Sequence, residues 1–123
     1  MNEQDVENEL SARGADAPRV TPDAIDRVID RVEYFRVPNT TVTVCAIVTR
    51  NGFAVTGESA CASEETFDEE IGRRLAYEDA RRKVWPLEGY LLRERMHTER
   101  RHQPTDASLH TQPIASVKMV ADS

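Results

Sequence analysis

The chain of 123 residues has few cysteines, few aromatic residues and no long apolar run. Its two cysteines, Cys45 and Cys61, have no histidine nearby, which argues against a zinc site. The N-terminal segment is acidic and lacks the apolar core of a secretory signal, and no stretch reaches the length of a membrane span. These absences predict a cytoplasmic protein with reduced thiols and no contact with a membrane.

A net positive charge is also lacking, because 22 aspartates and glutamates against 16 lysines and arginines give a formal net charge of −6. Binding to a DNA or RNA polymer requires a basic surface that displaces counterions, so we expect neither partner. A small anion held by a local arginine cluster remains compatible with this charge. The length fits one domain. Because the ends are more polar than the middle, we predict a polar, mobile arm at residues 1–20, one domain at 21–96 and a mostly irregular polar tail at 97–123. The tail has a weak strand signal at 114–120.

The domain is predicted to begin with a helix at Thr21, which suits the N-cap, followed by Pro22 at the first helical position. Apolar residues then recur at helical spacing until Pro38-Asn39 ends the element. These residues are Ile25, Val28, Ile29, Val32 and Phe35.

A β-hairpin is predicted next, with strands at 40–49 and 53–60 around Asn51-Gly52, the preferred pair for a two-residue type I′ turn. Such a turn places Val48 opposite Val55. One face then carries Val42, Val44, Ala46, Val48, Phe53 and Val55, and the other carries Thr41, Thr43, Cys45, Thr56 and Glu58. This polarity predicts that the valine-rich face packs on the helices.

A long helix is predicted from Thr66, where Thr66 and Glu69 fit a capping box. Its expected buried stripe consists of Phe67, Ile71, Leu75, Ala76, Ala80 and Val84. Pro86 predicts a kink or break at Trp85 before an apolar face resumes to about Met96. The fold class is therefore α+β: an N-terminal helix, an antiparallel β-hairpin and a long Pro-interrupted helix between polar arms. A lone two-stranded sheet leaves both edges unpaired, so we expect a homo-oligomer.

Catalytic chemistry finds little support. The carboxylates of Asp68, Glu69, Glu78 and Asp79 lie on a charged helix, whereas acid–base catalysis needs two carboxyls in different environments within a cleft. The histidines His97, His102 and His110 fall in the polar tail, where nothing fixes a metal ligand. Both cysteines fit small buried apolar residues better than nucleophiles. We predict no enzyme, no metal and no cofactor.

The basic residues of the long helix admit two interpretations. They can offset the helix dipole and form i,i+4 pairs such as Glu69–Arg73 and Glu70–Arg74. Alternatively, arginines can grip phosphates while Tyr77 and Tyr90 stack on flat bases. Elimination of core and tail residues leaves a candidate ligand site near a subunit boundary, formed by Asn51, Arg73, Arg74, Tyr77, Arg81, Tyr90 and Arg93.

Three spaced motifs point to a known family. They are Thr41-Val-Thr-Val-Cys45 leading to Asn51-Gly-Phe53, then Gly57-Glu-Ser-Ala-Cys61 leading to Phe67-Asp-Glu-Glu-Ile-Gly72, then Ala76-Tyr-Glu-Asp-Ala80 leading to Trp85-Pro-Leu-Glu-Gly-Tyr-Leu-Leu92. Over residues 40–95 the chain resembles a family of small tailed-phage and prophage proteins named as numbered gene products of a coliphage and a Shigella phage.

The size and the order of elements are also similar to phage proteins that counter Thoeris defence. Those proteins are oligomeric sponges that sequester cyclic ADP-ribose signals, and some also hold cyclic oligonucleotides. The resemblance implies a counter-defence protein that sequesters a small nucleotide-derived immune signal without cleaving it, and it transfers no ligand residue to this sequence. The alternatives are a phage protein-interaction module that inhibits a host protein and, last, a hydrolase of such signals.

Overall fold

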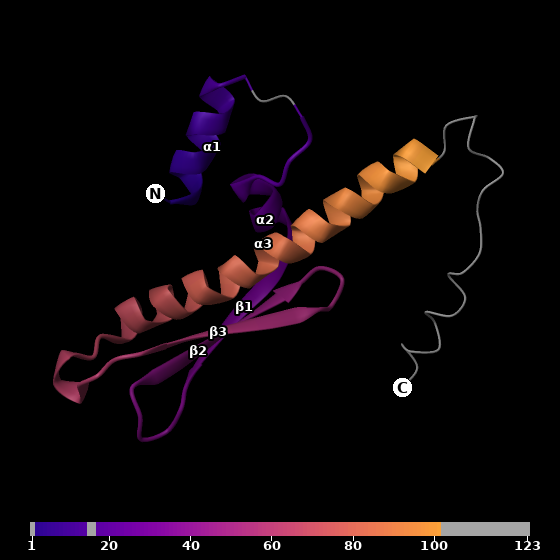
Figure 1. Cartoon of the computed structure of the whole chain (residues 1–123). Coiled ribbons are helices and arrows are strands. Elements are labelled where there is room, and N and C mark those ends of the chain that lie inside the picture. The colour runs from indigo at the N-terminus through magenta and orange to yellow at the C-terminus, as the bar shows by residue number, and fades with distance from the viewer. Residues whose placement is uncertain (1, 15–16, 102–123) are drawn as a thin grey trace. The chain divides into compact units, whose positions relative to one another are not determined.

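The computed structural model describes residues 2–14 and 17–101. It confirms the α+β class (Figure 1). The elements are α1 (Glu3–Ala12), α2 (Pro22–Val28), β1 (Ile29–Arg36), β2 (Val42–Thr49), β3 (Ala54–Ala60), a 3-10 turn (Glu64–Thr66) and α3 (Glu69–Arg101). The chain divides into a compact unit that ends at Leu92 and a second unit that begins at Arg93, and each is described separately. The strand predicted at 114–120 lies outside the described residues.

The two N-terminal helices begin at well-formed caps. In α1, the Asp5 amide donates to Asn2 Oδ1 at 2.8 Å, and the Asp5 carboxylate accepts from the Asn2 amide, which completes a capping box. In α2, the Ala24 amide donates to Thr21 Oγ1 at 3.1 Å, with Pro22 at the first position as predicted.

The helix predicted to continue to Phe35 is wrong beyond Val28, because the chain changes there to strand β1. This strand pairs antiparallel with β2, and an irregularity in the register lies between Ile29 and Arg31. Pro38 and Asn39 form the turn of a β-hairpin, where Asn39 has a φ of 63° and the Thr40 amide donates to the Val37 carbonyl. Proline followed by a residue with positive φ is typical of a type II turn, so the pair connects two strands.

The β2–β3 hairpin also differs from its prediction, by one residue of register. Val48 pairs with Ala54, and Val55 pairs with Ile47. The cause is a three-residue loop in which the Gly52 amide donates to the Thr49 carbonyl at 2.8 Å and Gly52 alone of the Asn51-Gly52 pair has positive φ, at 91°. A one-residue shift moves side chains to the other face of a sheet, so Val55 lies with Ile47.

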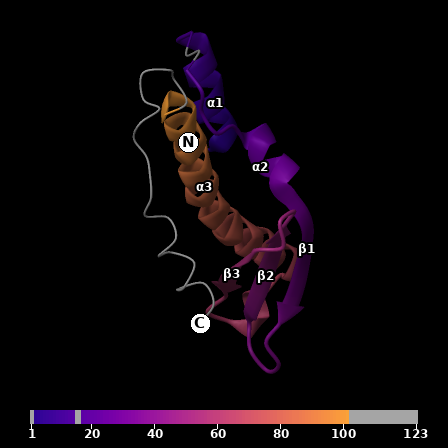
Figure 2. The ribbon, with the colours of Figure 1, turned by 90° about the vertical axis from the view of Figure 1, so that its right-hand side faces the viewer.

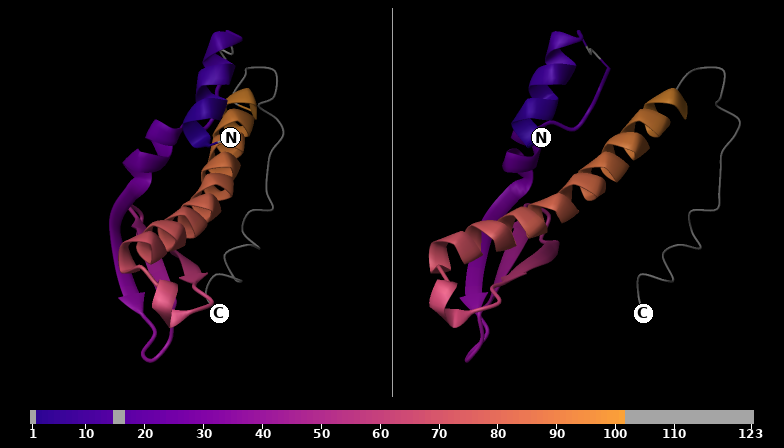
Figure 3. Two further views of the ribbon diagram at one scale, coloured as in Figure 1. Left: turned by 90° about the vertical axis from the view of Figure 1, so that its left-hand side faces the viewer. Right: turned by 60° about the vertical axis from the view of Figure 1, so that its left-hand side comes forward.

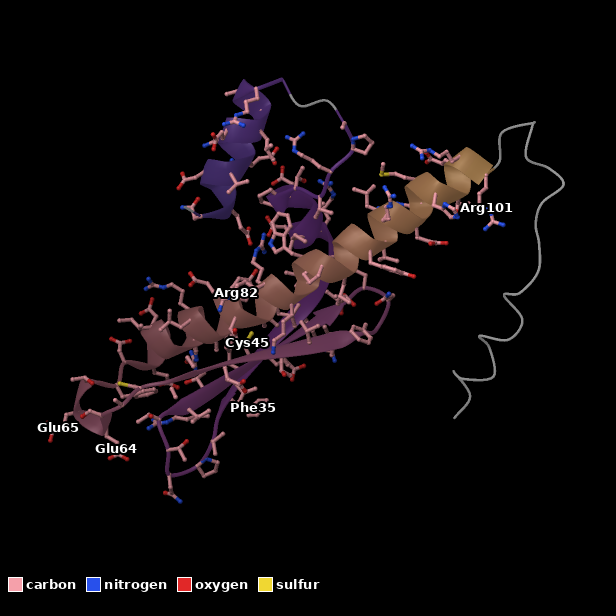
Figure 4. All side chains as sticks on the ribbon, viewed as in Figure 1. Phe35, Cys45, Glu64, Glu65, Arg82 and Arg101 are labelled. Carbon is pink, nitrogen blue, oxygen red and sulfur yellow. The ribbon has the colours of Figure 1, made fainter. Side chains whose placement is uncertain are left out.

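The sheet has the strand order β1-β2-β3, and α3 covers one of its faces (Figures 2 and 3). Alternate residues of β2 are buried on that face, namely Thr43, Cys45, Ile47 and Thr49. The predicted packing of Val42, Val44 and Val48 on the helices is therefore wrong, whereas Val55 does pack against the core. Figure 4 shows Cys45 on the helix side of the sheet and Phe35 on the opposite side.

Close contact between backbones explains which face α3 covers. A Cβ atom on Gly57 would lie 2.2 Å from the Ala80 nitrogen and 2.5 Å from the Ala76 oxygen. Only glycine permits such an approach, and the facing alanines leave room for it. The core consists of Ile25, Cys45, Ile47, Ala76, Ala80 and Val84.

The stripe of α3 that faces the sheet consequently consists mainly of small residues. Ile71 and Leu75, which were predicted to be buried, are 48% and 49% exposed. They lie on a neighbouring side of the helix, because the side that contacts Gly57 carries Gly72, Ala76, Ala80 and Val84.

Both predicted boundaries of the long helix are corrected. The N-cap is Asp68, whose Oδ1 accepts from the Ile71 amide at 3.1 Å, while Thr66 lies in the preceding 3-10 turn. Pro86 does not break the helix, which continues to Arg101. Pro86 and Arg82 are exposed, so the Arg82 carbonyl that loses its helical partner can reach water. Among the described helices, none is long and apolar enough to cross a membrane.

Side chains of α3 close the outer edge of β3. The Glu58 amide donates to Asp79 Oδ2 at 3.0 Å, and Lys83 Nζ donates to the Thr56 carbonyl at 2.6 Å. These two bonds occupy backbone groups that an added strand would need. The sheet is thus protected at β3.

Candidate anion-binding cleft

Arg81 is the centre of a polar cluster between α3 and the N-terminal helices. Its side chain is 11% exposed. The Nη1 atom donates to Asp26 Oδ1 and to the Tyr77 hydroxyl, both at 2.8 Å, and Nη2 donates to the Pro22 carbonyl at 3.2 Å. These contacts fix the direction of the guanidinium group.

The remaining donor of Arg81 binds α1. Its Nε lies 3.0 Å from Glu3 Oε1 and 2.8 Å from Glu3 Oε2. The indole nitrogen of Trp85, one helical turn further along α3, donates to the same Oε2 at 2.8 Å. Two N–H donors from α3 therefore converge on one carboxylate.

The electrostatics of this cluster favour the charged forms. Burial opposes the charge on Arg81, but its hydrogen bonds to Glu3, Asp26 and Tyr77 raise the pKa of Arg81 above its ordinary value. Burial likewise opposes the charge on Glu3, yet the hydrogen bonds from Arg81 and Trp85 lower the pKa of Glu3. Both groups are ionised at neutral pH.

Beside the cluster lies an open cleft with a volume of about 770 Å³. Its walls carry three arginines, Arg74, Arg81 and Arg82, together with Tyr77, and they also carry acidic residues from three helices. The acidic residues are Glu3, Asp26 and Glu78. Arg82 is 70% exposed and pairs with Asp79 at 3.0 Å, so its guanidinium can still turn toward a ligand.

The cleft unites three of the seven predicted site residues, Arg74, Tyr77 and Arg81. Asn51 is instead part of the β2–β3 turn, where its Oδ1 accepts from the Phe53 amide and from Thr49 Oγ1. Arg73 forms the predicted i,i+4 pair with Glu69 at 3.2 Å. The other predicted pair, Glu70–Arg74, is not formed among the described residues.

The two remaining candidates lie further along α3. Tyr90 is 69% exposed and is not part of the cleft wall. Arg93 is exposed and belongs to the second unit of the chain, which is described separately. The described parts of the chain contain no group of three or more histidine, cysteine, aspartate or glutamate residues able to hold a metal ion.

Sequence reasoning missed the roles of Glu3, Asp26 and Trp85. Glu3 belongs to a segment interpreted as a polar arm, and its partner Arg81 lies 78 positions away, so no local pattern connects them. Asp26 and Arg81 are likewise 55 positions apart. A usable signal was Trp85 itself, since an indole N–H close to a core needs a hydrogen-bond acceptor.

Comparison with protein families gives a match over most of the chain. Residues 20–96 match the profile of a family described as "Phage protein (N4 Gp49/phage Sf6 gene 66) family". The matched stretch contains α2, the whole sheet and most of α3, and it excludes α1. Comparisons with curated proteins and with solved structures gave no significant match.

Proposed function

Because the chain belongs to the phage protein family N4 Gp49/Sf6 gene 66, we propose that it is a phage counter-defence protein that binds a small nucleotide-derived immune signal. The ligand would be of the cyclic ADP-ribose or cyclic oligonucleotide type, sequestered in the cytoplasm of the infected cell without being cleaved. The observation that carries the proposal is the cleft in which Arg74, Tyr77, Arg81 and Arg82 meet.

The size and chemistry of the cleft support this ligand class. A volume of about 770 Å³ lies within the range of small-molecule sites. Arginine suits phosphate because its planar fork can donate two hydrogen bonds to one anion. Tyr77 adds an aromatic surface for a base, which stacks with little selectivity.

Binding without cleavage is supported by the state of the acidic groups. A general acid that works at neutral pH needs a raised pKa. The pKa of Glu3 is lowered, because its hydrogen bonds to Arg81 and Trp85 outweigh partial burial. Glu3 is therefore better suited to act as a structural anion, or as an anion that competes with a ligand, than as a proton donor.

Uptake and recovery of ligand test the proposal. The protein is incubated with cyclic ADP-ribose isomers or cyclic oligonucleotides, freed of excess ligand and then heat-denatured. Recovery of intact ligand is expected, whereas cleaved ligand would indicate a hydrolase and absence of uptake would contradict ligand binding. Arg74→Ala and Arg82→Ala should each weaken uptake by roughly 10- to 150-fold, the value of a charge-assisted hydrogen bond. Arg95→Ala, an exposed arginine outside the cleft wall, serves as the control.

We also propose that the chain forms a homo-oligomer through the face of the sheet that α3 leaves open. This open face carries Val42, Val44, Ala46 and Val48 on the central strand, with Phe35 55% exposed on β1. Because the apolar row lies on the middle strand, a two-fold axis places it against its own copy. The Arg31–Glu33 pair on this face, at 2.8 Å, is neutral, whereas Glu58, opposite Val44 on β3, is a carboxylate that a contact between copies must leave in water.

The same open face favours the second candidate function, a protein-interaction module that inhibits a host protein. Exposed apolar patches mark interaction sites. A protein that takes up no cyclic nucleotide, stays monomeric and loses a host partner when Val44 is replaced by Glu would support this alternative over sequestration.

A further inference from the structure

The carboxylate of Glu3 occupies a position suited to an anion of a ligand. It receives Arg81 Nε at 2.8 Å and Trp85 Nε1 at 2.8 Å. Arginine and a second N–H donor converging on one oxygen are typical of oxyanion recognition. Arg81 is held in place by Asp26, Tyr77 and the Pro22 carbonyl, so its Nε would keep this direction without Glu3.

The helix that brings Glu3 is only loosely packed. No residue of α1 is buried, and Val6 is 43% exposed. A hollow of about 390 Å³ separates the apolar side of α1, including Val6 and Leu10, from Val20 and Trp85. Polar contacts such as the Glu7–Arg19 pair at 2.5 Å connect α1 to the rest of the unit. This pair is partly buried, with side chains 26% and 19% exposed, so it and the Glu3 bonds to Arg81 and Trp85 are the contacts that separation of α1 must break.

The occupant and the site belong to different parts of the chain. Arg81, Trp85, Tyr77 and Asp26 all fall within the stretch that matches the family. Glu3 falls in the segment before it. The donors therefore lie in the stretch that matches the family, and the carboxylate that binds them comes from α1, which precedes that stretch.

We propose that Arg81 and Trp85 form a subsite for a phosphate group, and that Glu3 is a built-in competitor which the ligand displaces together with α1. This inference deepens the proposed function and rests on it for the identity of the natural ligand. A tethered competitor has a high effective concentration, and it lowers the apparent affinity by the fraction of time that it occupies the site. Displacement also changes the environment of Trp85.

Trp85 is the only tryptophan of the chain, so its fluorescence reports on the subsite directly. Inorganic phosphate is titrated, at constant ionic strength, into the full chain, into Glu3→Ala and into Glu9→Ala. Glu9 lies exposed on the same helix and pairs with Arg13, which makes it a matched control for charge. Glu3→Gln is a second variant that keeps the side-chain length. Acetate replaces phosphate in a parallel titration to distinguish a phosphate site from a general carboxylate site.

We expect Glu3→Ala to bind phosphate about 3- to 10-fold more tightly than the parent, with Glu9→Ala unchanged and Glu3→Gln between them. Trypsin should cut at Arg13 and Arg19 faster when phosphate is bound. Equal phosphate affinity of Glu3→Ala and the parent, absence of phosphate binding by both, or tighter binding of acetate than of phosphate would overturn the inference. Any of these results can coexist with nucleotide uptake by the parent, whereas failed uptake with the expected phosphate result would overturn only the proposed function.

Discussion

The two faces of the sheet differ in a way that side-chain polarity alone does not explain. The face covered by α3 includes Thr43, Thr49 and Cys45 in β2 and Gly57 in β3. Thr43 Oγ1 is buried there and finds no hydrogen-bond partner among the described residues, a cost of about 1–3 kcal/mol. On β2 the open face is the more apolar one, with Val42, Val44, Ala46 and Val48, yet these residues remain half-exposed. The helix thus covers the face that permits close approach and leaves the valine-rich face open.

The largest effect should come from breaking the close approach at Gly57. Gly57→Ala places a Cβ 2.2 Å from the Ala80 nitrogen, so α3 must move away from the sheet. We expect a loss of about 3 kcal/mol or more in the free energy of unfolding, measured by urea denaturation. Gly89→Ala is the matched control, because nothing lies within 4 Å of its added Cβ and alanine favours a helix. It should stabilise the protein by about 0.5–1 kcal/mol, and similar values for both variants would contradict the close approach.

A second comparison replaces valine by alanine once on the covered face of the sheet and once on the open face. Val84 is fully buried between α3 and the sheet, whereas Val48 is half-buried on the open face. Val84→Ala should lower the free energy of unfolding by about 2–3 kcal/mol, through lost burial and a cavity. Val48→Ala should cost less than about 1 kcal/mol in dilute protein. A larger loss for Val48→Ala under those conditions would mean that the open face is covered within one chain.

The open face itself is tested by a charge. Val44→Glu should leave the free energy of unfolding of the dilute chain within about 1 kcal/mol of the parent, because the side chain can reach water. In an interface between copies, the same carboxylate would be buried without a partner. We expect self-association at least about tenfold weaker, or about 1.4 kcal/mol, by sedimentation velocity. Val6→Glu, on an exposed position of α1, is the control and should not change association.

These differences also show which parts of the fold could be predicted from the sequence. The caps at Thr21 and Pro22 and the α+β class were predicted because they depend on local chemistry. Strand β1 was missed because Ile25, Val28, Ile29 and Val32 fit a helical period, while pairing with β2 decides the structure after Val28. The wrong face followed from the polarity of β2, because its valines were expected to pack on the helices and its threonines to face water. The one-residue error in the turn concerned β3, where it placed Val55 with those valines.

The candidate site shows the same limit. Tyr77 and Arg81 were both selected by residue type and by elimination, and they meet because they lie four positions apart on α3. Asp26 and Glu3 reach Arg81 from distant parts of the sequence, and only the folded chain reveals that they neutralise it. Asn51 and Arg73 were selected by residue type, but their local partners in the turn and in the first turns of the helix hold them elsewhere.

The smallest expected effect is the pH dependence of stability. It concerns the polar contacts on the helix side of the sheet and not the apolar contacts of the open face. Partial burial opposes ionisation of Glu3, but hydrogen bonds from Arg81 and Trp85 lower the pKa of Glu3. Hydrogen bonds from the Glu58 amide and from the Arg82 side chain similarly lower the pKa of Asp79 at the β3 edge. A carboxylate with a depressed folded-state pKa contributes stability above its unfolded pKa, about 4.3 for glutamate, and loses it as the pH falls through the lower folded value. Because Glu3 is partly solvated, we expect its contribution to be below about 1 kcal/mol.

Acidification from pH 7 to about pH 3 should therefore release α1 while leaving the apolar contacts of the open face unaffected by the protonation of Glu3. Trp85 emission should shift in a single step below the ordinary pKa of glutamate, because protonated Glu3 no longer accepts as an anion from Arg81 and Trp85. Asp26 faces the same guanidinium, so Asp26→Asn should leave the step in place and Glu3→Gln should abolish it. Sedimentation measured across the same range should show association persisting through the Trp85 step. Two results together would instead place the contact between copies on the helix side of the sheet. The parent would dissociate at the pH of the Trp85 step, and Glu3→Gln would already be dissociated at pH 7.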